Sequence, residues 1–204
     1  WLLDADLYYK NTTGITSLTF GFFNRFDSEI HQGQEYTQGV DVLIQKSAHH
    51  WRAWLTYSYQ NAQNKFENLN ENQYFPVNSD IQHAFNLSVF KKWNRFSMAL
   101  GWNWHTGKPY SLLDENNQII YFNTHRLPAF HRMDVSGMYQ FSNQNHWKGT
   151  VGFSIINLYN QRNFLSKEYQ RQYSSLESTF NADFTTQNYT SLGFTPNLFL
   201  KIQF

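Results

Sequence analysis

The sequence predicts an all-β fold, an antiparallel up-and-down transmembrane β-barrel. Most of the chain consists of segments in which apolar and polar residues alternate, which is the period of a strand with two different faces. The connections between these segments alternate between long and short, as in outer-membrane barrels. Aromatic residues make up 19% of the chain and charged residues 15%, at a mean hydropathy of -0.62. Strands that face lipid on one side and water on the other account for both values.

Composition excludes several other classes of protein. No apolar run of the 204 residues approaches the ~18 residues of a spanning helix, which excludes a helical membrane protein. The net charge of +1 gives no electrostatic footprint for nucleic acid, so we expect no nucleic-acid partner. Because cysteine is absent, the chain forms neither disulfides nor thiolate metal sites.

The first expected strand begins at residue 2. Residues 2–10 alternate in polarity, residues 11–14 interrupt the phase, and Leu18 resumes the alternation on the other parity. A β-bulge within one long strand is the preferred interpretation. The alternative is a turn at residues 11–14 that leads into a second strand. A polar loop is expected at 24–38.

Further strands are expected at 39–46, 51–60, 85–89 and 96–105. The last of these has the cleanest alternation in the chain, because Phe96, Met98, Leu100, Trp102 and Trp104 oppose small or polar residues. The connections in this region are a long loop at 61–80 and short turns at 47–50 and 91–95.

A long loop at 106–128 separates these strands from the last group, with Gly107 and Pro109 near its start and Pro128 at its end. Strands are then expected at 132–141, 148–159 and 188–204, joined by a short turn at 142–146 and a long polar connection at 160–187. The count is about eight strands, and an even number places the C-terminus on the side of the short turns.

The chain ends on Phe204, in the middle of a strand. In a soluble sheet such a last strand would leave an unpaired edge, which a barrel removes by pairing the last strand with the first. A terminal Phe after alternating apolar residues resembles the last strand of bacterial outer-membrane barrels, in which it is the insertion signal. The same alternation predicts lipid-facing positions at Leu100, Trp102, Val135, Leu200 and Ile202.

Aromatic residues occupy two levels of the expected strands. Rings next to the short turns are Trp51, Trp93, Phe96 and Trp147, and rings toward the long loops are Tyr57, Tyr59, Trp102 and Trp104. Amphipathic rings favour the headgroup level on both sides of a bilayer, so we interpret these residues as two interfacial girdles. Ordinary cross-strand packing of aromatic rings is the alternative.

Five segments resemble, in order along the chain, motifs of the TonB-dependent outer-membrane receptors. Residues 39–41 (GVD) are similar to the family's GVE/GVD segment, and 104–109 (WHTGKP) to its SGxP segment. Residues 127–135 (LPAFHRMDV) resemble its LPxYHRLDL strand opening. Residues 155–160 (IINLYN) with Asn163 resemble NLYNxxN, and 194–197 (FTPN) leading to Phe204 resembles the closing strand. The likeness covers most of the chain and corresponds to about the C-terminal third of such a receptor.

The resemblance implies that residues 1–204 are the C-terminal segment of a larger barrel in the bacterial outer membrane, one of about 22 strands with a plugged lumen. Such receptors import scarce nutrients, such as siderophores, glycans or peptides, with energy passed through TonB. The implied partners are outer-membrane lipid, an N-terminal plug and further barrel strands upstream, TonB through that missing part, and a surface lipoprotein. Because we expect the plug and the TonB box to lie outside these residues, the chain is not expected to transport by itself.

Several charged and polar residues fall on the polar faces of the expected strands. In a plugged barrel they would line the lumen and contact the plug or the substrate path. The alternative is that they solvate a wet lumen and pair across strands. These lumen-facing candidates are Asp41, Arg52, Asn103, His105, Arg132 and Asp134.

No pattern in the sequence predicts an enzyme, a metal site or a cofactor. The eight histidines are scattered, and no carboxylate stands at ligand spacing beside the pair His49 and His50. His131 and Asp134 differ by an odd offset, so a regular strand turns them to opposite faces. No G-x-S-x-G elbow occurs.

Two other functions remain open from the sequence alone. The chain could be a small eight-stranded outer-membrane barrel that serves as an anchor or adhesin, or a soluble all-β carbohydrate-binding module. The first requires a signal peptide just upstream of Trp1, and the second requires that the aromatic faces be buried. A plug of about a domain's length upstream would favour the receptor.

Overall fold

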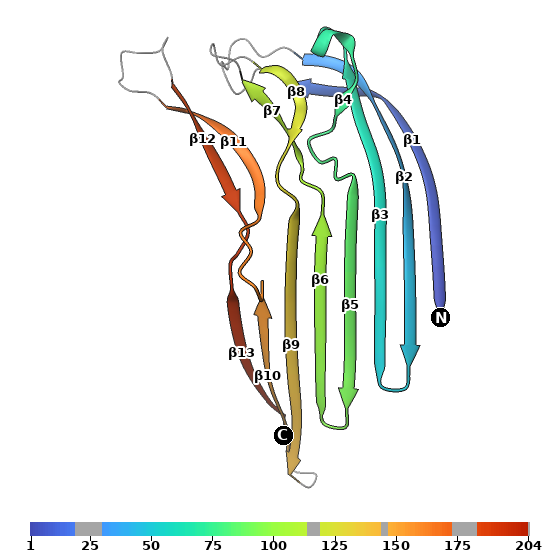
Figure 1. Cartoon of the computed structure of the whole chain (residues 1–204), viewed down its shortest axis with the longest axis vertical. Coiled ribbons are helices and arrows are strands. Elements are labelled where there is room, and N and C mark those ends of the chain that lie inside the picture. Colours follow the sequence, from blue (N-terminus) through green and yellow to red (C-terminus); the bar gives the residue numbers. More distant parts are fainter. Residues whose placement is uncertain (19–29, 114–118, 144–146, 173–182, 204) are drawn as a thin grey trace.

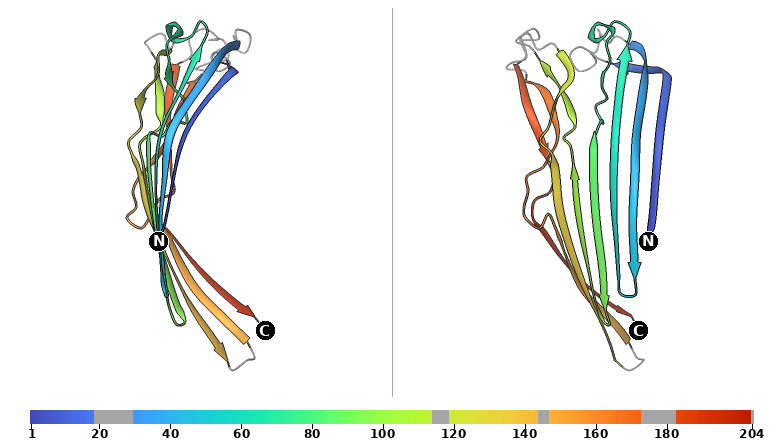
Figure 2. Two further views of the ribbon diagram at one scale, coloured as in Figure 1. Left: turned by 90° about the vertical axis from the view of Figure 1, so that its right-hand side faces the viewer. Right: turned by 45° about the vertical axis from the view of Figure 1, so that its right-hand side comes forward.

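The computed structural model describes residues 1–18, 30–113, 119–143, 147–172 and 183–203. It confirms an all-β, antiparallel fold built from one large sheet and two smaller hairpins. Figure 1 shows the large sheet as a tall wall of long strands, and Figure 2 shows that this wall bends along its length when seen edge-on.

The large sheet has nine strands, eight of which follow one another along a single path. In order, the path is β1 (Leu2–Leu18), β2 (Ile30–Ala48), β3 (Trp51–Phe66), β5 (His83–Trp93), β6 (Phe96–His105), β9 (Phe130–Asn143), β10 (Trp147–Ile156) and β13 (Thr195–Gln203). The ninth strand, β4 (Phe75–Pro76), pairs with β3. The edges of the sheet are β1 and β13, so the described residues form an open sheet.

Two hairpins and a short helix occupy the connections. The hairpins are β7 (Pro109–Leu113) with β8 (Ile119–Arg126), and β11 (Phe164–Gln172) with β12 (Asp183–Thr190). A 3-10 helix, η1 (Asn70–Asn72), lies between β3 and β4. Figure 1 places these elements at one end of the sheet, the loop end. The links β2–β3 and β5–β6 lie at the other end, the turn end, as does the end of β9.

The bulge expected near residues 11–14 is confirmed. β1 is one continuous strand, and its register with β2 shifts between Thr13 and Ile15. Gly14 lies in the left-handed region at a φ of 75°, a conformation that glycine adopts without steric cost. The parity of the apolar residues changes here because the bulge adds one residue to β1.

The predicted long loops are shorter than expected because strands extend into them. The expected loop 24–38 is wrong from residue 30 onward, because β2 begins at Ile30, and β3 continues through the expected loop 61–80 as far as Phe66. The loops 106–128 and 160–187 contain the hairpins β7–β8 and β11–β12. The expected last strand 188–204 is divided, since β12 ends at Thr190 and β13 begins at Thr195. Phe204, the predicted insertion signal, lies outside the described residues.

A small buried core forms at the loop end. Phe66, Leu69 and Phe75 are buried, and Ile15 and Phe122 pack against them. The Phe75 ring centre lies 6.0 Å from that of Phe66 and 5.2 Å from that of Phe122. This core therefore joins β3, β4 and β8 at the loop end of the large sheet.

Candidate functional site

The strand register separates the side chains of the large sheet into two faces. Residues that lie directly opposite each other in an antiparallel ladder project to the same side. Leu100 lies opposite Val135 on one side, and the next residue, Gly101, lies opposite Asp134 on the other. We call the first side the apolar face and the second the polar face.

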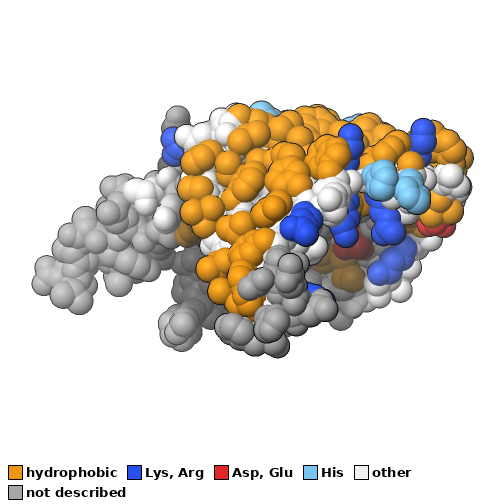
Figure 3. All heavy atoms as spheres, turned by 90° about the horizontal axis from the view of Figure 1, so that it is seen from below, with side chains coloured by type: hydrophobic (Ala, Val, Ile, Leu, Met, Phe, Trp, Pro, Cys, Tyr) orange, Lys and Arg blue, Asp and Glu red, His pale blue; other side chains and the backbone are white. Residues whose placement is uncertain are grey.

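The apolar face carries all the positions that the sequence predicts to face lipid. Trp102 lies opposite Met133, Leu200 opposite Val151, and Ile202 opposite Gly149. At the edge of the sheet, Leu198 is 85% exposed and Leu200 is 64% exposed. Figure 3, which looks at the turn end, shows hydrophobic side chains covering much of the visible surface.

Aromatic rings bound the apolar face at both ends. Near the turns, Trp93 lies opposite Phe96, and their ring centres are 5.8 Å apart. Toward the loop end, Phe85 lies opposite Trp104. The two levels are eight residues apart on both β5 and β6, or about 26 Å along a strand. An outer-membrane barrel has an apolar band of about 25 Å between two aromatic girdles.

The six lumen-facing candidates lie on the polar face. The register continues from one strand to the next, so each candidate belongs to a row of side chains on that face. The row nearest the loop end contains Asp41, Ser58, Ala84 and His105, and the next row contains Asn103 and Arg132. The third row contains Asp134. The fourth row contains Arg52, Phe90, Ala99 and Ser136.

The structure brings Arg132 and Asp134 into contact. Arg132 Nη2 lies 2.9 Å from Asp134 Oδ2, and both side chains are about one-third exposed or less. His105 stacks on Phe130, with ring centres 4.7 Å apart. Asp41 and Arg52 lie in different rows of the polar face, so the candidates form no single cluster. His131 lies opposite Trp104 on the apolar face, away from Asp134, as its odd offset predicts.

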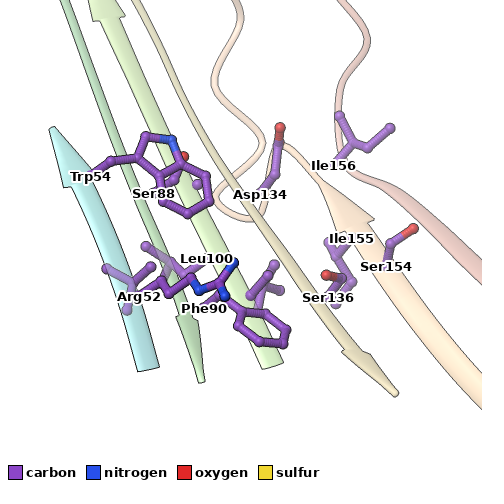
Figure 4. A pocket seen from close by; sticks show the side chains of 14 residues that line it. Arg52, Trp54, Ser88, Phe90, Leu100, Asp134, Ser136, Ser154, Ile155 and Ile156 are labelled. Atoms are coloured by element: carbon purple, nitrogen blue, oxygen red, sulfur yellow. The ribbon is translucent and has the colours of Figure 1, made fainter. Parts of the chain in front are cut away.

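A hollow of about 550 Å³ lies against the polar face. Figure 4 shows its labelled residues, which come from neighbouring strands of the large sheet. Arg52 of β3 lies opposite Phe90 of β5. The small side chains of Ser88 and Ser136 leave space beside them. Trp54, also in the lining, is 38% exposed. The lining of the hollow therefore includes an arginine and two aromatic rings.

Asn157 and Asn163 form a buried junction that the sequence did not predict. Asn157 is fully buried and has a φ of 56°, in the left-handed region that Asn adopts more readily than most residues. Its Nδ2 donates to the carbonyl oxygens of Gln161 at 2.8 Å and Leu192 at 2.9 Å. Its backbone N–H donates to Asp134 Oδ1 at 2.9 Å. Asn157 therefore ties the end of β10 to the link before β13 through its side chain, and to Asp134 of the polar face through its backbone.

Asn163 fixes the same junction to β9. Its Oδ1 accepts the backbone N–H of His131 at 3.0 Å, and its Nδ2 donates to the His131 carbonyl at 2.9 Å. The segment NLYNxxN thus has a structural role, because both of these asparagine side chains satisfy backbone groups of other segments. The motif was visible in the sequence, but the partners of its side chains were not.

Asp80 and Arg126 form a second buried junction that the sequence did not predict. Asp80 is 1% exposed, and its Oδ2 accepts from Arg126 Nη2 at 2.5 Å. Asp80 Oδ1 accepts the backbone N–H of Ala62 at 3.0 Å, and Arg126 Nη1 donates to the Gly107 carbonyl at 3.2 Å. The pair therefore joins β3, the loop after β4, and the β7–β8 hairpin.

Further contacts bind the two hairpins into the loop end. Tyr169 of β11 donates its hydroxyl to the Ser111 carbonyl of β7 at 2.9 Å. Burial, and secondarily the neighbouring Tyr110, raise the pKa of Tyr169 above its usual value of 10.0. Asn123 of β8 donates Nδ2 to the Pro76 carbonyl of β4 at 2.7 Å. These bonds connect β11 to β7 and β8 to β4, so the described parts of three connections contact one another at the loop end.

Among the residues that the structure describes, no three His, Asp or Glu side chains stand close enough together to hold a metal ion. No helix in the described part of the chain has the length and apolarity to cross a membrane. Comparison of the chain with protein-family models, with curated proteins and with solved structures found no match.

Proposed function

We propose that this chain is a segment of barrel wall in an outer-membrane TonB-dependent transporter that imports a scarce nutrient. The observation that carries the proposal is the separation of the sheet into two faces. One face is apolar between two aromatic levels that lie eight residues apart on β5 and β6, close to the height of the apolar band of an outer-membrane barrel. The other face is polar and carries all six lumen-facing candidates.

The polar face supports a wide barrel over a small one. A barrel of eight strands fills its interior with side chains, whereas larger barrels enclose a plug or water. The polar face has small residues where a filled interior needs large ones, such as Ser88, Gly101 and Ser136, and a hollow lies over them. The open edges at β1 and β13 offer backbone groups for pairing with further strands.

We assign each proposed partner to one part of the structure. Outer-membrane lipid covers the apolar face, and a plug domain from upstream sequence fills the space over the polar face. TonB acts through that plug. A surface lipoprotein binds at the loop end. The nutrient is a siderophore, a glycan, a peptide or a similar molecule, and the wall itself carries no catalytic step.

A transport assay tests the function. Cells that produce the polypeptide containing this chain are given candidate siderophores, glycans and peptides, with and without TonB. We expect uptake of one class, and its loss when TonB is removed. Uptake that persists without TonB contradicts the proposal.

The second candidate is a small eight-stranded barrel that serves as anchor or adhesin. The eight strands along the path of the sheet favour it, since eight is a complete barrel in some outer-membrane proteins. Cysteine substitutions at Leu87 and Ser88 distinguish the two, because these neighbours lie on opposite faces. In a wide barrel, Ser88→Cys reacts with a water-soluble maleimide once the plug is removed, and Leu87→Cys does not. In a small filled barrel neither reacts.

A further inference from the structure

Two lysines lie among the tryptophans at the turn end of the apolar face. Lys46 Nζ is 4.5 Å from the ring centre of Trp1 and 5.3 Å from that of Trp51. Lys91 Nζ is 4.7 Å from the ring centre of Trp93. At these distances an ammonium group is attracted to the face of the aromatic ring.

The register places both lysines on the apolar face. Lys91 lies directly opposite Trp51, and Lys46 lies opposite Ala53, which is two residues along β3 from Trp51. Trp51 therefore stands between the two lysines, on the same side of the sheet as Leu100. Long lysine side chains at such a position extend along apolar surface and hold the charge at the level of the lipid headgroups.

Neither lysine forms an ion pair with a carboxylate among the described residues. The segments around the turn end, 1–5, 42–55, 88–100, 135–156 and 195–203, contain one carboxylate side chain, Asp4. Asp4 lies opposite Leu43 on the polar face, away from the two lysines. The same segments contain seven lysines and arginines, which are Lys46, Arg52, Lys91, Lys92, Arg95, Lys148 and Lys201. Figure 3 shows Lys and Arg side chains gathered in one part of this end, next to histidine.

The opposite rim of the apolar face has a different character. On β3, β5, β6 and β9 its residues are aromatic or histidine, and on β1 and β2 the same rows continue with aliphatic residues. Tyr57 Oη lies 3.0 Å from His83 Nδ1. The row of Tyr57 also contains Phe85, Trp104 and His131. No lysine, arginine or carboxylate belongs to these described rows. In the described rows, lysine therefore lies at the turn-end rim of the apolar face and not at its loop-end rim.

We propose that Lys46 and Lys91, with Trp51 between them, bind the phosphate of an anionic phospholipid in the leaflet at the turn end. The phosphate supplies the counter-ion that the protein does not, and the acyl chains lie against the apolar face beside Leu55 and Leu100. This inference rests on the membrane orientation of the proposed function. Anionic lipid, and not a zwitterionic one, is the expected occupant because the surrounding segments carry seven lysines and arginines and one aspartate, which lies on the polar face.

Native mass spectrometry tests the site on the polypeptide that contains this chain, released from micelles with equal amounts of phosphatidylglycerol and phosphatidylcholine. We expect bound phosphatidylglycerol to exceed phosphatidylcholine, and the ratio to fall about fivefold for each of Lys46→Gln and Lys91→Gln. Lys65→Gln is the matched control, because Lys65 also lies over a ring, that of Tyr74 at 5.5 Å, but belongs to the loop end. It should leave the ratio unchanged.

Three results would overturn the inference. One is equal retention of the two lipids by the unsubstituted protein, and another is a loss in Lys65→Gln equal to that in Lys46→Gln or Lys91→Gln. The third is full displacement of phosphatidylglycerol by inorganic phosphate, which would make the site one for free phosphate. Failure of the protein to enter micelles or membranes would instead count against the proposed function, so the two failures are distinguishable.

Discussion

Leu100 and Gly101 are neighbours in β6, yet Leu100 lies opposite Val135 on the apolar face and Gly101 lies opposite Asp134 on the polar face. The alternation of a strand makes this inevitable, and it gives a matched pair of positions at one depth of the sheet. A Cβ at Gly101 would meet no atom within 4 Å, so a larger side chain has room there.

Replacing these two residues with arginine should have opposite outcomes. In the proposed membrane orientation, Leu100→Arg puts a charge into the bilayer and should cost about 2–4 kcal/mol of folding free energy. Gly101→Arg projects toward the polar face and should change stability by less than about 0.5 kcal/mol. Urea titration of the polypeptide folded into vesicles measures both. Equal costs for the two variants would contradict the assignment of faces.

Gly107 should tolerate no side chain. A Cβ built there would overlap the carbonyl oxygen of Leu127, which is backbone and has little freedom to move. Gly107→Ala should therefore push the segments apart and cost about 1–3 kcal/mol. The bond from the Leu127 N–H to the Lys108 carbonyl, 2.9 Å long, would open with them.

Hydrogen exchange at the Leu127 amide measures this change. Gly107→Ala should speed the exchange, and Gly101→Ala, which meets open space, should not. Slow exchange of Leu127 in both variants would show that the close approach of residues 107 and 127 is not required.

Arg126 should protect a loop that lies far from it in sequence. Arg126→Met leaves the Asp80 carboxylate buried without its ionic partner, and losing one member of a buried pair costs about 3–5 kcal/mol. The cost should appear locally, as faster proteolysis between residues 67 and 79. The double variant Asp80→Asn with Arg126→Met removes the buried charge and should recover part of the protection. Identical cleavage rates in all three proteins would contradict this role for the pair.

The strands with one apolar and one polar face were predictable from sequence because their residues alternate strictly in polarity. Strand 96–105 and the bulge before Ile15 are where the sequence placed them. The missed start of β2 is a segment in which neither face is apolar. Residues 30–38 carry Gln32, Gln34 and Gln38, so the pattern there resembles a loop. Pairing on both sides with β1 and β3 holds this segment extended, and that pairing leaves no local signal.

The polar face was also predictable, since parity alone assigns Arg132 and Asp134 to it. The buried junctions were not. Asp80 meets Arg126 across 46 residues of sequence, and Asn163 meets His131 across 32. Such contacts depend on how hairpins fold back onto the sheet. A single sequence gives composition and period but not the partner of an individual side chain.

The phenol of Tyr169 should ionise above pH 10.0, because burial first, and then Tyr110, raise its pKa in the folded protein. A raised pKa means that the folded state keeps the proton more strongly than the unfolded state. The stabilisation is therefore complete below pH 10.0 and is lost as the pH rises through the higher folded value. The difference in absorbance at 295 nm between the native protein and Tyr169→Phe reports this titration, and a midpoint at or below 10.0 would contradict it.

The two ends of β3 should lie on opposite sides of the outer membrane. Ala48 is exposed at the end of β2, next to the turn before β3, and Asn68 is exposed in the loop after β3. The described residues between these positions cross the apolar band once, from Trp51 to Tyr59. The chain has no cysteine of its own, so single cysteines at these positions can be labelled selectively, with the unsubstituted polypeptide as the background control. On intact cells, a membrane-impermeant maleimide should label Asn68→Cys and spare Ala48→Cys until the outer membrane is permeabilised. The reverse pattern would invert the topology, and equal labelling of both cysteines on intact cells would contradict a membrane-spanning strand altogether.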